Sequence, residues 1–474
     1  MSEAEIVLHI SEQGDDANGG SREQPLWSVA IALNKVRWQS YKTARFVIHG
    51  SIAEIPAHNA MIDITGKGLP VIFLCGESPD KPGKLNAADI HKRVIYISDG
   101  NTLYIEENIV ICGGQTQEMS GSGITLENGT VIMRGGEISG NNSGFGMGGG
   151  VYVGKNSEFI MEGGRITENT TMMHGGGVFP DEGGIFTMSG GTISKNTAYL
   201  GGGGVFVGVG SDFEMTGGSI DGNTSGTEKN MLLGGIALPL GQGGGVYVNP
   251  GTTFRMRGGE IVNNRAISMR KDDPDSGSGG GVFVEEGGVF YLEAGKIKKN
   301  GVMNWGGGIH TEGSVIIAHD SLICNNVARL GGGGIHIAGE KAGVVMKGGF
   351  VMNNYTAGNG GGINILPGGS LVLESGIISD NTSGALGNGL AIEGTALMRG
   401  GCILTSLGGL NGAKAGKSSG AGGDEKEKAD TDTDTLILIT DTGKLTRQGG
   451  EIDGKLTMKD ASRFENLRES EKKT

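Results

Sequence analysis

The stretch Met161-Glu-Gly-Gly-Arg-Ile166-Thr-Glu-Asn169 decides the fold, because variants of it recur along most of the chain. The next two copies are Met188-Ser-Gly-Gly-Thr-Ile193-Ser-Lys-Asn196 and Met215-Thr-Gly-Gly-Ser-Ile220-Asp-Gly-Asn223. The Asn that ends each copy forms a series: Asn141, Asn169, Asn196, Asn223, Asn264, Asn300, Asn325, Asn354 and Asn381. Undisturbed copies are 27 or 28 residues apart. A period in this range is typical of solenoids and related repeat folds.

A second motif, a glycine run followed by three strand-forming residues, lies between successive copies of the first. Gly204-Val-Phe-Val207 and Gly245-Val-Tyr-Val248 are examples. Each repeat therefore holds three short strands, bounded by Gly and Asn residues that supply turns with positive φ. This pattern predicts an all-β parallel β-helix with three short strands per rung. A propeller needs longer blades and a leucine-rich repeat needs its own Leu frame, so neither fits.

Stacking the repeats in register places equivalent residues in columns about 4.8 Å apart. One predicted interior column is aromatic: Phe159, Phe186, Phe213, Phe254 and Phe290. The repeated Asn residues form a second column, which we interpret as a buried amide ladder. Some of them also lie in glycosylation sequons, such as Asn169-Thr-Thr and Asn381-Thr-Ser.

Composition excludes several classes of protein. Glycine accounts for 95 of 474 residues, but it falls in phase with the strands, unlike in a low-complexity chain. The formal charge of −13 and the lack of a Lys/Arg cluster argue against nucleic-acid binding. The four cysteines have no metal-type spacing, and no segment is long and apolar enough for a membrane span. No cofactor motif emerges, because the many Gly-x-Gly matches are products of the repeat.

The repeat also predicts the organisation of the chain. Residues 1–45 hold a strand and then a helix, opened by Pro25, that caps the solenoid with Leu26, Val29, Ala30 and Leu33 on one face. The remaining predicted parts are a β-helix over 46–405 with insertions at 224–242 and 266–278, a flexible loop at 406–434, and final rungs with a charged tail at 435–474.

The frame Gly-Gly-x-Ile-x-x-Asn, combined with Gly-Gly-Gly-Val-Tyr/Phe-Val, resembles the repeats of polymorphic outer-membrane proteins and autotransporter adhesins. These belong to the pectin-lyase-like superfamily, so the resemblance implies a right-handed β-helix. It also implies a secreted or cell-surface protein. The start Met1-Ser-Glu-Ala-Glu5 is too acidic and polar for a signal peptide, so a cytoplasmic location stays open. The superfamily includes lyases, hydrolases, tailspikes and adhesins, so the resemblance leaves the activity open.

One acidic group is a candidate calcium site for a polysaccharide lyase of this fold. Asp272, Asp273 and Asp275 lie beside Arg270 and Lys271. A lyase would need clustered acidic ligands for calcium next to a basic residue. The group falls within a predicted insertion, where a solvated run of charges is the alternative interpretation.

The middle residues of the Val-x-Val strands form a candidate ligand-binding column. Alternation directs them outward while their aliphatic neighbours point inward. The column contains Tyr152, Phe179, Phe206, Tyr247, Phe283, His310 and His336. An exposed aromatic strip would suit a glycan or a partner chain. The alternative is that the rings stack on one another or lie beneath an insertion. The two stacked histidines lack the third ligand that a metal site needs.

We therefore expect a non-catalytic β-helix scaffold for adhesion or recognition, which binds a polysaccharide or a partner protein. A polysaccharide lyase or glycoside hydrolase with its site near residues 266–340 is the first alternative. A tailspike-like or filament-forming subunit, which would self-associate, is the second.

Overall fold

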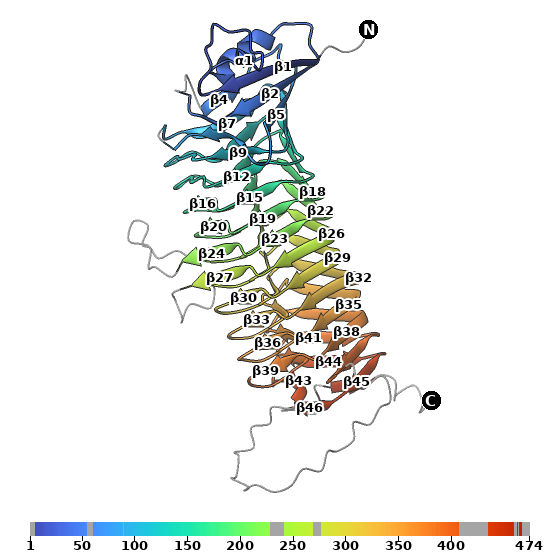
Figure 1. Ribbon diagram of the computed structural model, residues 1–474. Coiled ribbons are helices and arrows are strands. Elements are labelled where there is room, and N and C mark those ends of the chain that lie inside the picture. The colour runs from blue at the N-terminus through green and yellow to red at the C-terminus, as the bar shows by residue number, and fades with distance from the viewer. Residues whose placement is uncertain are drawn as a thin grey trace, which may run out of the picture.

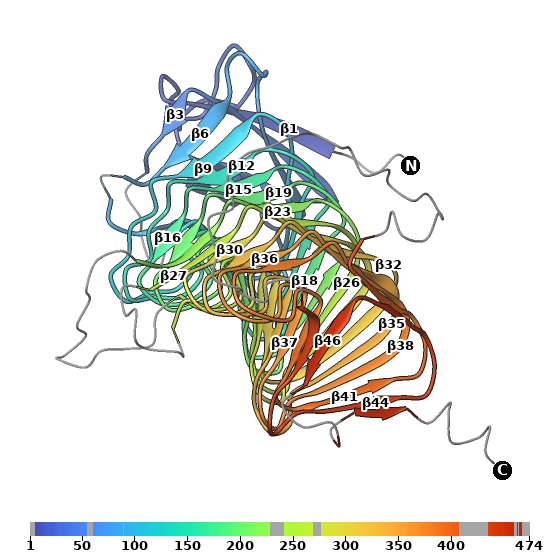
Figure 2. The ribbon, with the colours of Figure 1, turned by 90° about the horizontal axis from the view of Figure 1, so that it is seen from below.

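The computed structural model describes residues 5–54, 60–88, 90–227, 241–268, 276–406, 435–458, 462 and 464–466. It is an all-β parallel β-helix, which confirms the predicted fold class. The rungs stack along one axis, with β1 (Glu5–Ser11) near one end and β46 (Lys455–Met458) near the other (Figure 1). Figure 2, which looks along the stack, shows the coils superposed around a common interior. Among the described residues, no helix has the length and apolar character needed to cross a bilayer.

Three parallel sheets form the sides of the coil. Sheet B takes one strand from each rung: β4 (Ala60–Ile64), β7 (Arg93–Ser98), β10 (Ile124–Glu127), β13 (Val151–Val153), β17 (Val178–Pro180), β21 (Val205–Val207), β25 (Val246–Val248), β28 (Val282–Val284), β31 (Ile309–Thr311), β34 (Ile335–Ile337), β37 (Ile363–Ile365), β40 (Leu390–Ile392), β43 (Thr435–Ile439) and β46. Sheet C is shorter: β16 (Thr170–Thr171), β20 (Thr197–Ala198), β24 (Thr224–Thr227), β27 (Arg265–Ser268), β30 (Gly301–Val302), β33 (Val327–Ala328), β36 (Tyr355–Thr356) and β39 (Thr382–Ser383). These strands of two to four residues follow the ladder Asn residues from Asn169 to Asn381, but not Asn141, and they were not predicted.

Sheet A takes the two remaining strand positions of each rung. Its first position holds β1, β2 (Thr43–His49), β5 (Val71–Gly76), β8 (Thr102–Ile105), β11 (Thr130–Met133), β14 (Glu158–Met161), β18 (Ile185–Met188), β22 (Asp212–Met215), β41 (Thr395–Met398), β44 (Lys444–Arg447) and β47 (Phe464–Asn466). Its second holds β3 (Ser51–Ile52), β6 (Gly83–Asn86), β9 (Ile109–Cys112), β12 (Glu137–Ser139), β15 (Arg165–Thr167), β19 (Thr192–Ser194), β23 (Ser219–Asp221), β42 (Cys402–Leu404) and β45 (Glu451–Asp453). In five rungs the two positions merge into one long strand: β26 (Thr253–Val262), β29 (Val289–Lys298), β32 (Ser314–Cys324), β35 (Gly343–Met352) and β38 (Ser370–Ser379).

The interior is a narrow column of apolar side chains that runs the length of the solenoid. The predicted column of phenylalanine residues is confirmed within this interior. Phe159, Phe186, Phe213, Phe254 and Phe290 pair in register on consecutive strands and are at most 1% exposed. Their neighbouring rings stack with centroids 4.6 to 5.4 Å apart. Offset ring stacking adds to the area that each ring buries.

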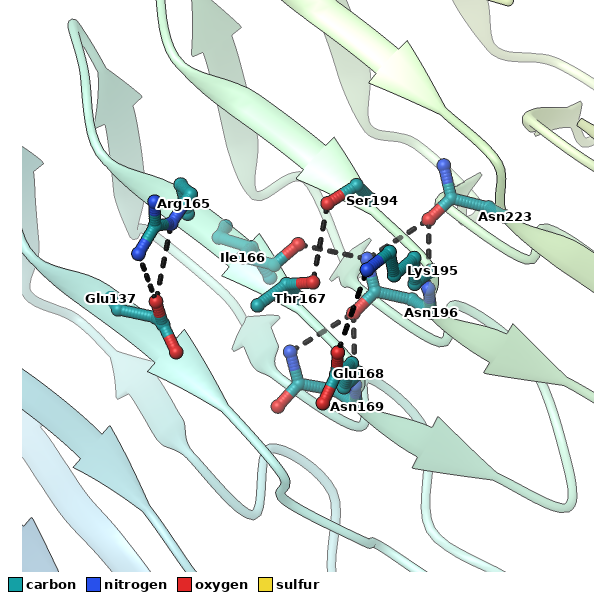
Figure 3. Close-up of polar contacts among 10 residues, drawn as sticks. All are labelled: Glu137, Arg165, Ile166, Thr167, Glu168, Asn169, Ser194, Lys195, Asn196 and Asn223. Atoms are coloured by element: carbon teal, nitrogen blue, oxygen red, sulfur yellow. Dashed lines mark hydrogen bonds and ion pairs between the residues drawn. The ribbon is translucent and has the colours of Figure 1, made fainter. Parts of the chain in front are cut away.

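The repeated Asn residues form the expected amide ladder at one corner (Figure 3). Asn169 Nδ2 donates to Asn196 Oδ1 at 3.0 Å, and the same oxygen accepts from the Asn169 backbone N–H. The second proton of the Asn169 side-chain amide goes to the carbonyl of Ile138. Each ladder Asn therefore satisfies polar groups on neighbouring rungs that would otherwise be buried without partners.

The prediction of one ladder residue, Asn325, is wrong. Asn326, and not Asn325, accepts from Asn300 and donates to Asn354. The residue before each ladder position has left-handed backbone, and Asn325 fills that turn at φ 56° with its side chain exposed. Asn tolerates this conformation well. When two Asn residues are adjacent, the sequence therefore does not show which one forms the turn and which one belongs to the ladder.

The N-terminal cap also differs from its prediction. The helix α1 runs Val29–Val36 and begins after Ser28, whose Oγ accepts from the Ile31 N–H. It does not begin at Pro25, because Leu26 instead forms a parallel bridge with Ile10. Ala30 is exposed, and the buried face consists of Val29, Ala32, Leu33 and Val36. Glu54 accepts hydrogen bonds from the Val29 and Ala30 N–H groups at the helix start.

The predicted insertions start within described strands. Residues 224–227 form β24 and residues 265–268 lie in β27. Residues 228–240 and 269–275, like residues 407–434 of the predicted loop, lie outside the described residues. Sheet B resumes at β43, which pairs with β40 in parallel. The boundaries of the predicted parts remain predictions.

Candidate functional site

The outward column of sheet B is present, but it is not an exposed strip. In β21, Val205 and Val207 point into the core and Phe206 points away from it. Alternation therefore predicted the direction of these side chains correctly. The expectation of exposure was wrong: Phe179, Phe206, Tyr247, Phe283, His310 and His336 are each at most 7% exposed, and only Tyr152 is partly accessible.

The rings of this column stack on one another, as the alternative interpretation holds. Centroids lie 6.0 Å apart from Tyr152 to Phe179, 5.1 Å from Phe179 to Phe206 and 4.4 Å from Phe206 to Tyr247. The series continues through Phe283 to His310 at 4.8 Å and from His310 to His336 at 5.1 Å. These ring faces contact each other, so they are not free to stack on a ligand.

The chain segment that precedes each sheet B strand covers the column. His174 packs on Phe206 at 4.3 Å between ring centroids, and Trp305 packs on His336 at 4.5 Å. Gly202 shows why glycine is needed here. Its φ is 65°, and a Cβ on it would lie 2.7 Å from the Phe206 Cβ. The glycine runs therefore allow the backbone to pass directly over the outer rings.

The histidines of the column have few further metal ligands around them among the described residues. Neutral imidazole is the form that metals bind, and burial lowers the pKa of His336 well below its usual value. However, His336 Nδ1 is 3.1 Å from Asn364 Nδ2, which occupies one ring nitrogen. Over the described ranges, no group of three His, Cys, Asp or Glu side chains could hold a metal ion. The candidate calcium ligands Asp272, Asp273 and Asp275 lie outside those ranges.

Beside the column, a tyrosine hydroxyl of one rung forms a hydrogen bond with a carboxylate of the next rung, and this pair occurs three times among the described residues. Tyr96 donates to Glu127 at 3.0 Å, Tyr152 to Asp181 at 3.4 Å, and Tyr247 to Glu285 at 2.6 Å. In each pair the carboxylate lies on the following rung, two residues beyond the middle of its strand. We call this row the tyrosine–carboxylate edge.

The tyrosine hydroxyls on this edge keep their protons. Burial, followed by the hydrogen bond to Glu127, raises the pKa of Tyr96 to about 12. Burial also raises the pKa of Tyr152, with Asp181 as the next cause, and the pKa of Tyr247, with Glu285 as the next cause. The hydroxyls are therefore donors at neutral pH, and the carboxylates keep acceptor positions for a ligand.

Two surface pockets open along the edge. The first, of about 480 Å³, is lined by both Tyr96 and Tyr152, together with Asp99, Glu127, Lys155 and Glu182. The second, of about 330 Å³, is lined by Tyr247, Glu285, Glu312, His174 and Gln242. In the second pocket Glu312 Oε1 lies 3.5 Å from His310 Nε2. Both pockets thus combine aromatic edges with carboxylates.

A third pocket lies away from this edge, beside the turns that follow the second strand position of sheet A. It measures about 970 Å³ and is lined by amide groups and apolar side chains, among them Gln117, Met119, Asn142 and Phe145. Phe145 is 47% exposed. This pocket differs chemically from the other two because Glu118 is its only carboxylate among the described residues.

Sequence reasoning missed the tyrosine–carboxylate edge because its partners come from different repeats. Glu127, Asp181, Glu285 and Glu312 each follow a Val-x-Val-type strand by a fixed offset, and that regularity was the available signal. The pairing with a tyrosine one rung earlier becomes visible only in register. Comparison with family models, curated proteins and solved structures finds no match to this chain.

Proposed function

We propose that the protein is a non-catalytic recognition scaffold that binds a neutral or amino-bearing glycan chain along the tyrosine–carboxylate edge. The observation that carries the proposal is the repetition of one polar pair on three rungs, with pockets around it. Sugar hydroxyls donate hydrogen bonds to oriented acceptors. The carboxylates and the tyrosine oxygens of the edge supply such acceptors.

The charge of the pockets supports a glycan that is not acidic. Asp99, Glu127 and Glu182 face the first pocket, with Lys155 as the one basic side chain among its lining residues. Carboxylates accept hydrogen bonds from hydroxyls and attract ammonium groups, but they repel uronates. The tyrosines of the edge lie on β7, β13 and β25, so the pairs recur every two or three rungs of about 4.8 Å each. A repeating polymer could therefore contact the edge repeatedly, which raises its total affinity.

A surface-type role follows from the resemblance of the repeats. Gly-Gly-x-Ile-x-x-Asn with Gly-Gly-Gly-Val-Tyr/Phe-Val is similar to adhesin-type repeats, and a parallel β-helix is the fold that this similarity implies. Stacked repeats give a solenoid extended surfaces for binding, and the proposal uses one of them.

Affinity electrophoresis in gels cast with neutral, amino-bearing and acidic polysaccharides tests the proposal. We expect neutral or amino-bearing polymers to retard the protein without being degraded, and acidic polymers to leave it unaffected. Tyr152→Phe and Glu285→Gln should each reduce the retardation, whereas Tyr355→Phe on sheet C should not. Retardation by acidic polymers alone, or loss of binding on Phe145→Ala with the edge variants unaffected, would contradict the proposal.

A carbohydrate-active enzyme is the second candidate, and one observation favours it. Glu285 and Glu312 line the same pocket, and both lie within the interval 266–340 where the sequence placed an enzyme site. Glycosidases use two carboxylates on opposite sides of the scissile bond. Cleared polymer behind the protein band, abolished by Glu312→Gln, would establish this activity and replace the scaffold proposal.

A further inference from the structure

The outer face of sheet A changes character over four consecutive rungs, from β32 to β41 and β42. Two outward positions of each rung are apolar there: Ile316, Val345, Val372 and Leu397 in the first column, and Leu322, Phe350, Ile377 and Cys402 in the second. All are partly accessible or exposed, and Phe350 is 38% exposed. We call these eight residues the apolar window.

Charged rungs bound the window at both ends. On the preceding side, Lys296 stands in the second column, 3.3 Å from Glu260 Oε1. On the following side, Glu451 continues that column beyond Cys402. The second column therefore changes from a charged surface to an apolar one and back, whereas Tyr291 and Thr446 flank the first column. Contiguous exposed apolar surface of this kind typically marks an interaction site.

Charged residues cross the middle of the window and alternate in sign from rung to rung. Lys347, Glu374 and Arg399 each follow the last inward residue of the first strand position. On the preceding rung, Asp320 lies between Ile317 and Leu322, where the register with β35 shifts. The order along the stack is thus negative, positive, negative, positive, and all four side chains are exposed.

When this order of charges is read in the opposite direction along the stack, every charge meets one of opposite sign. A second copy rotated by 180° about an axis along the strands brings the rung of Lys347 opposite the partner's rung that holds Glu374. The same rotation places the rung of Asp320 opposite the one that holds Arg399. A copy with its solenoid axis parallel would instead place like charges together. Like charges across an interface disfavour association, so the pattern selects the antiparallel arrangement.

The size of the face is sufficient for a specific dimer. Strands β35 and β38 each have 10 residues. At about 3.3 Å per residue and about 4.8 Å per rung, four rungs present about 600 Å² per copy. Two copies would bury about 1,200 Å², the lower end of the range for specific interfaces. In Figure 1 β32, β35 and β38 lie side by side as long parallel arrows. Sheets with such flat faces pack in aligned layers.

We propose that the apolar window is the interface of a homodimer in which two solenoids lie antiparallel, related by a two-fold axis. The interface is isologous, so each contact occurs twice. Sheet B lies on a different side of the coil, and its tyrosine–carboxylate edge stays outside the proposed interface. The dimer would thereby present two such edges.

Sedimentation equilibrium of the full chain, over a wide concentration range, tests the proposal. We expect the wild-type protein to have twice the chain mass. Phe350→Glu should weaken the dimer at least about tenfold, because it buries a charge in an apolar contact. Thr192→Glu, in the same outward column on an earlier rung, should leave the mass unchanged. A monomer at all concentrations, or a dimer unaffected by Phe350→Glu, would overturn the proposal.

Mixing two charge-reversal variants tests the antiparallel arrangement. Glu374 Oε1 also lies 3.5 Å from Arg399 Nη1 of its own chain, but Glu374→Lys breaks that pair in the mixture as well, so recovery of dimers reports the contact between chains. Lys347→Glu alone should be largely monomeric, since it faces Glu374 of the partner subunit, and Glu374→Lys alone should be monomeric for the matching reason. An equimolar mixture should recover dimers, because both cross-interface pairs are then opposite in sign. Circular dichroism of each variant confirms folding. Folded single variants whose mixture stays monomeric would overturn the proposal, and so would single variants that remain dimeric.

Discussion

The Asn223 side-chain amide donates to Asn264 Oδ1 at 3.0 Å although 41 residues separate them in sequence. Neighbouring members of the ladder have the same geometry across 27 residues. The longer excursion between Asn223 and Asn264 therefore leaves the rung spacing unchanged. The ladder thus holds the register of the coil across this longer separation in sequence.

Asn326→Ala should destabilise the protein by on the order of 3 kcal/mol. Asn326 Oδ1 accepts from the backbone and side chain of Asn300, and Asn326 Nδ2 donates to the carbonyl of Ile297. Alanine leaves these groups buried without partners. The denaturant midpoint measures the loss. Asn325→Gly is the matched control: its φ of 56° suits glycine, so we expect a change within about 0.5 kcal/mol. Equal losses at both positions would contradict the assignment of the ladder.

Gly202→Ala should cost more than about 2 kcal/mol, and Gly222→Ala only about 1 kcal/mol. Both glycines have a positive φ, 65° and 64°. A Cβ at Gly202 would lie 2.6 Å from the Val205 carbonyl oxygen and close to Phe206, whereas a Cβ at Gly222 meets nothing within 4 Å. The pair thus separates the steric cost of close packing from the cost of the backbone conformation. Thermal unfolding of the two variants, side by side, provides the comparison.

The fold could be predicted because repetition converts a sequence period into spatial columns. The spacing of Phe213 and Phe254 around an insertion already indicated one interior stack, and the rings are 4.6 Å apart. Local ambiguity remained where two residues of one type are adjacent, as at Asn325 and Asn326. The start of α1 was predicted wrongly, because Pro25 is a common first helical residue, whereas the helix begins after Ser28, a favourable N-cap residue.

The candidate site was harder to predict, because a side chain that points away from the core can still be covered by other parts of the chain. Alternation correctly directs Phe206 away from the core, yet the backbone at Gly202 passes over it. The glycine runs before most sheet B strands carried this information, because a Cβ at a position such as Gly202 would clash with the outward ring residue. The pair of Tyr247 and Glu285 joins residues 38 apart, so it becomes visible only when the register is known.

Phe206→Ala should lower stability by about 3 to 5 kcal/mol, as is typical for a buried aromatic residue. Phe206 is 5% exposed and contacts rings of Phe179, Tyr247 and His174. An exposed ligand platform would instead lose binding with little loss of stability. Phe145→Ala is the control, because Phe145 is 47% exposed and should cost less than about 1 kcal/mol. A Phe206 variant as stable as the wild-type protein would contradict the buried stack.

Between about pH 4.5 and pH 7, ionisation of Glu54 should reduce the stability of the wild-type protein relative to Glu54→Gln. Burial raises the pKa of Glu54 from 4.5 to about 7, against the opposing hydrogen bonds from Val29 and Ala30. The folded state therefore binds more protons than the unfolded state in this window, and the free energy of unfolding falls as pH rises. Gln cannot ionise. The difference between variant and wild type should thus grow by on the order of 3 kcal/mol across the window. Denaturant unfolding at a series of pH values measures it, and carbon NMR of the carboxyl group should titrate near pH 7. A pH-independent difference together with a titration near pH 4.5 would show that the Glu54 carboxylate is solvated, in contradiction to its buried position beside α1.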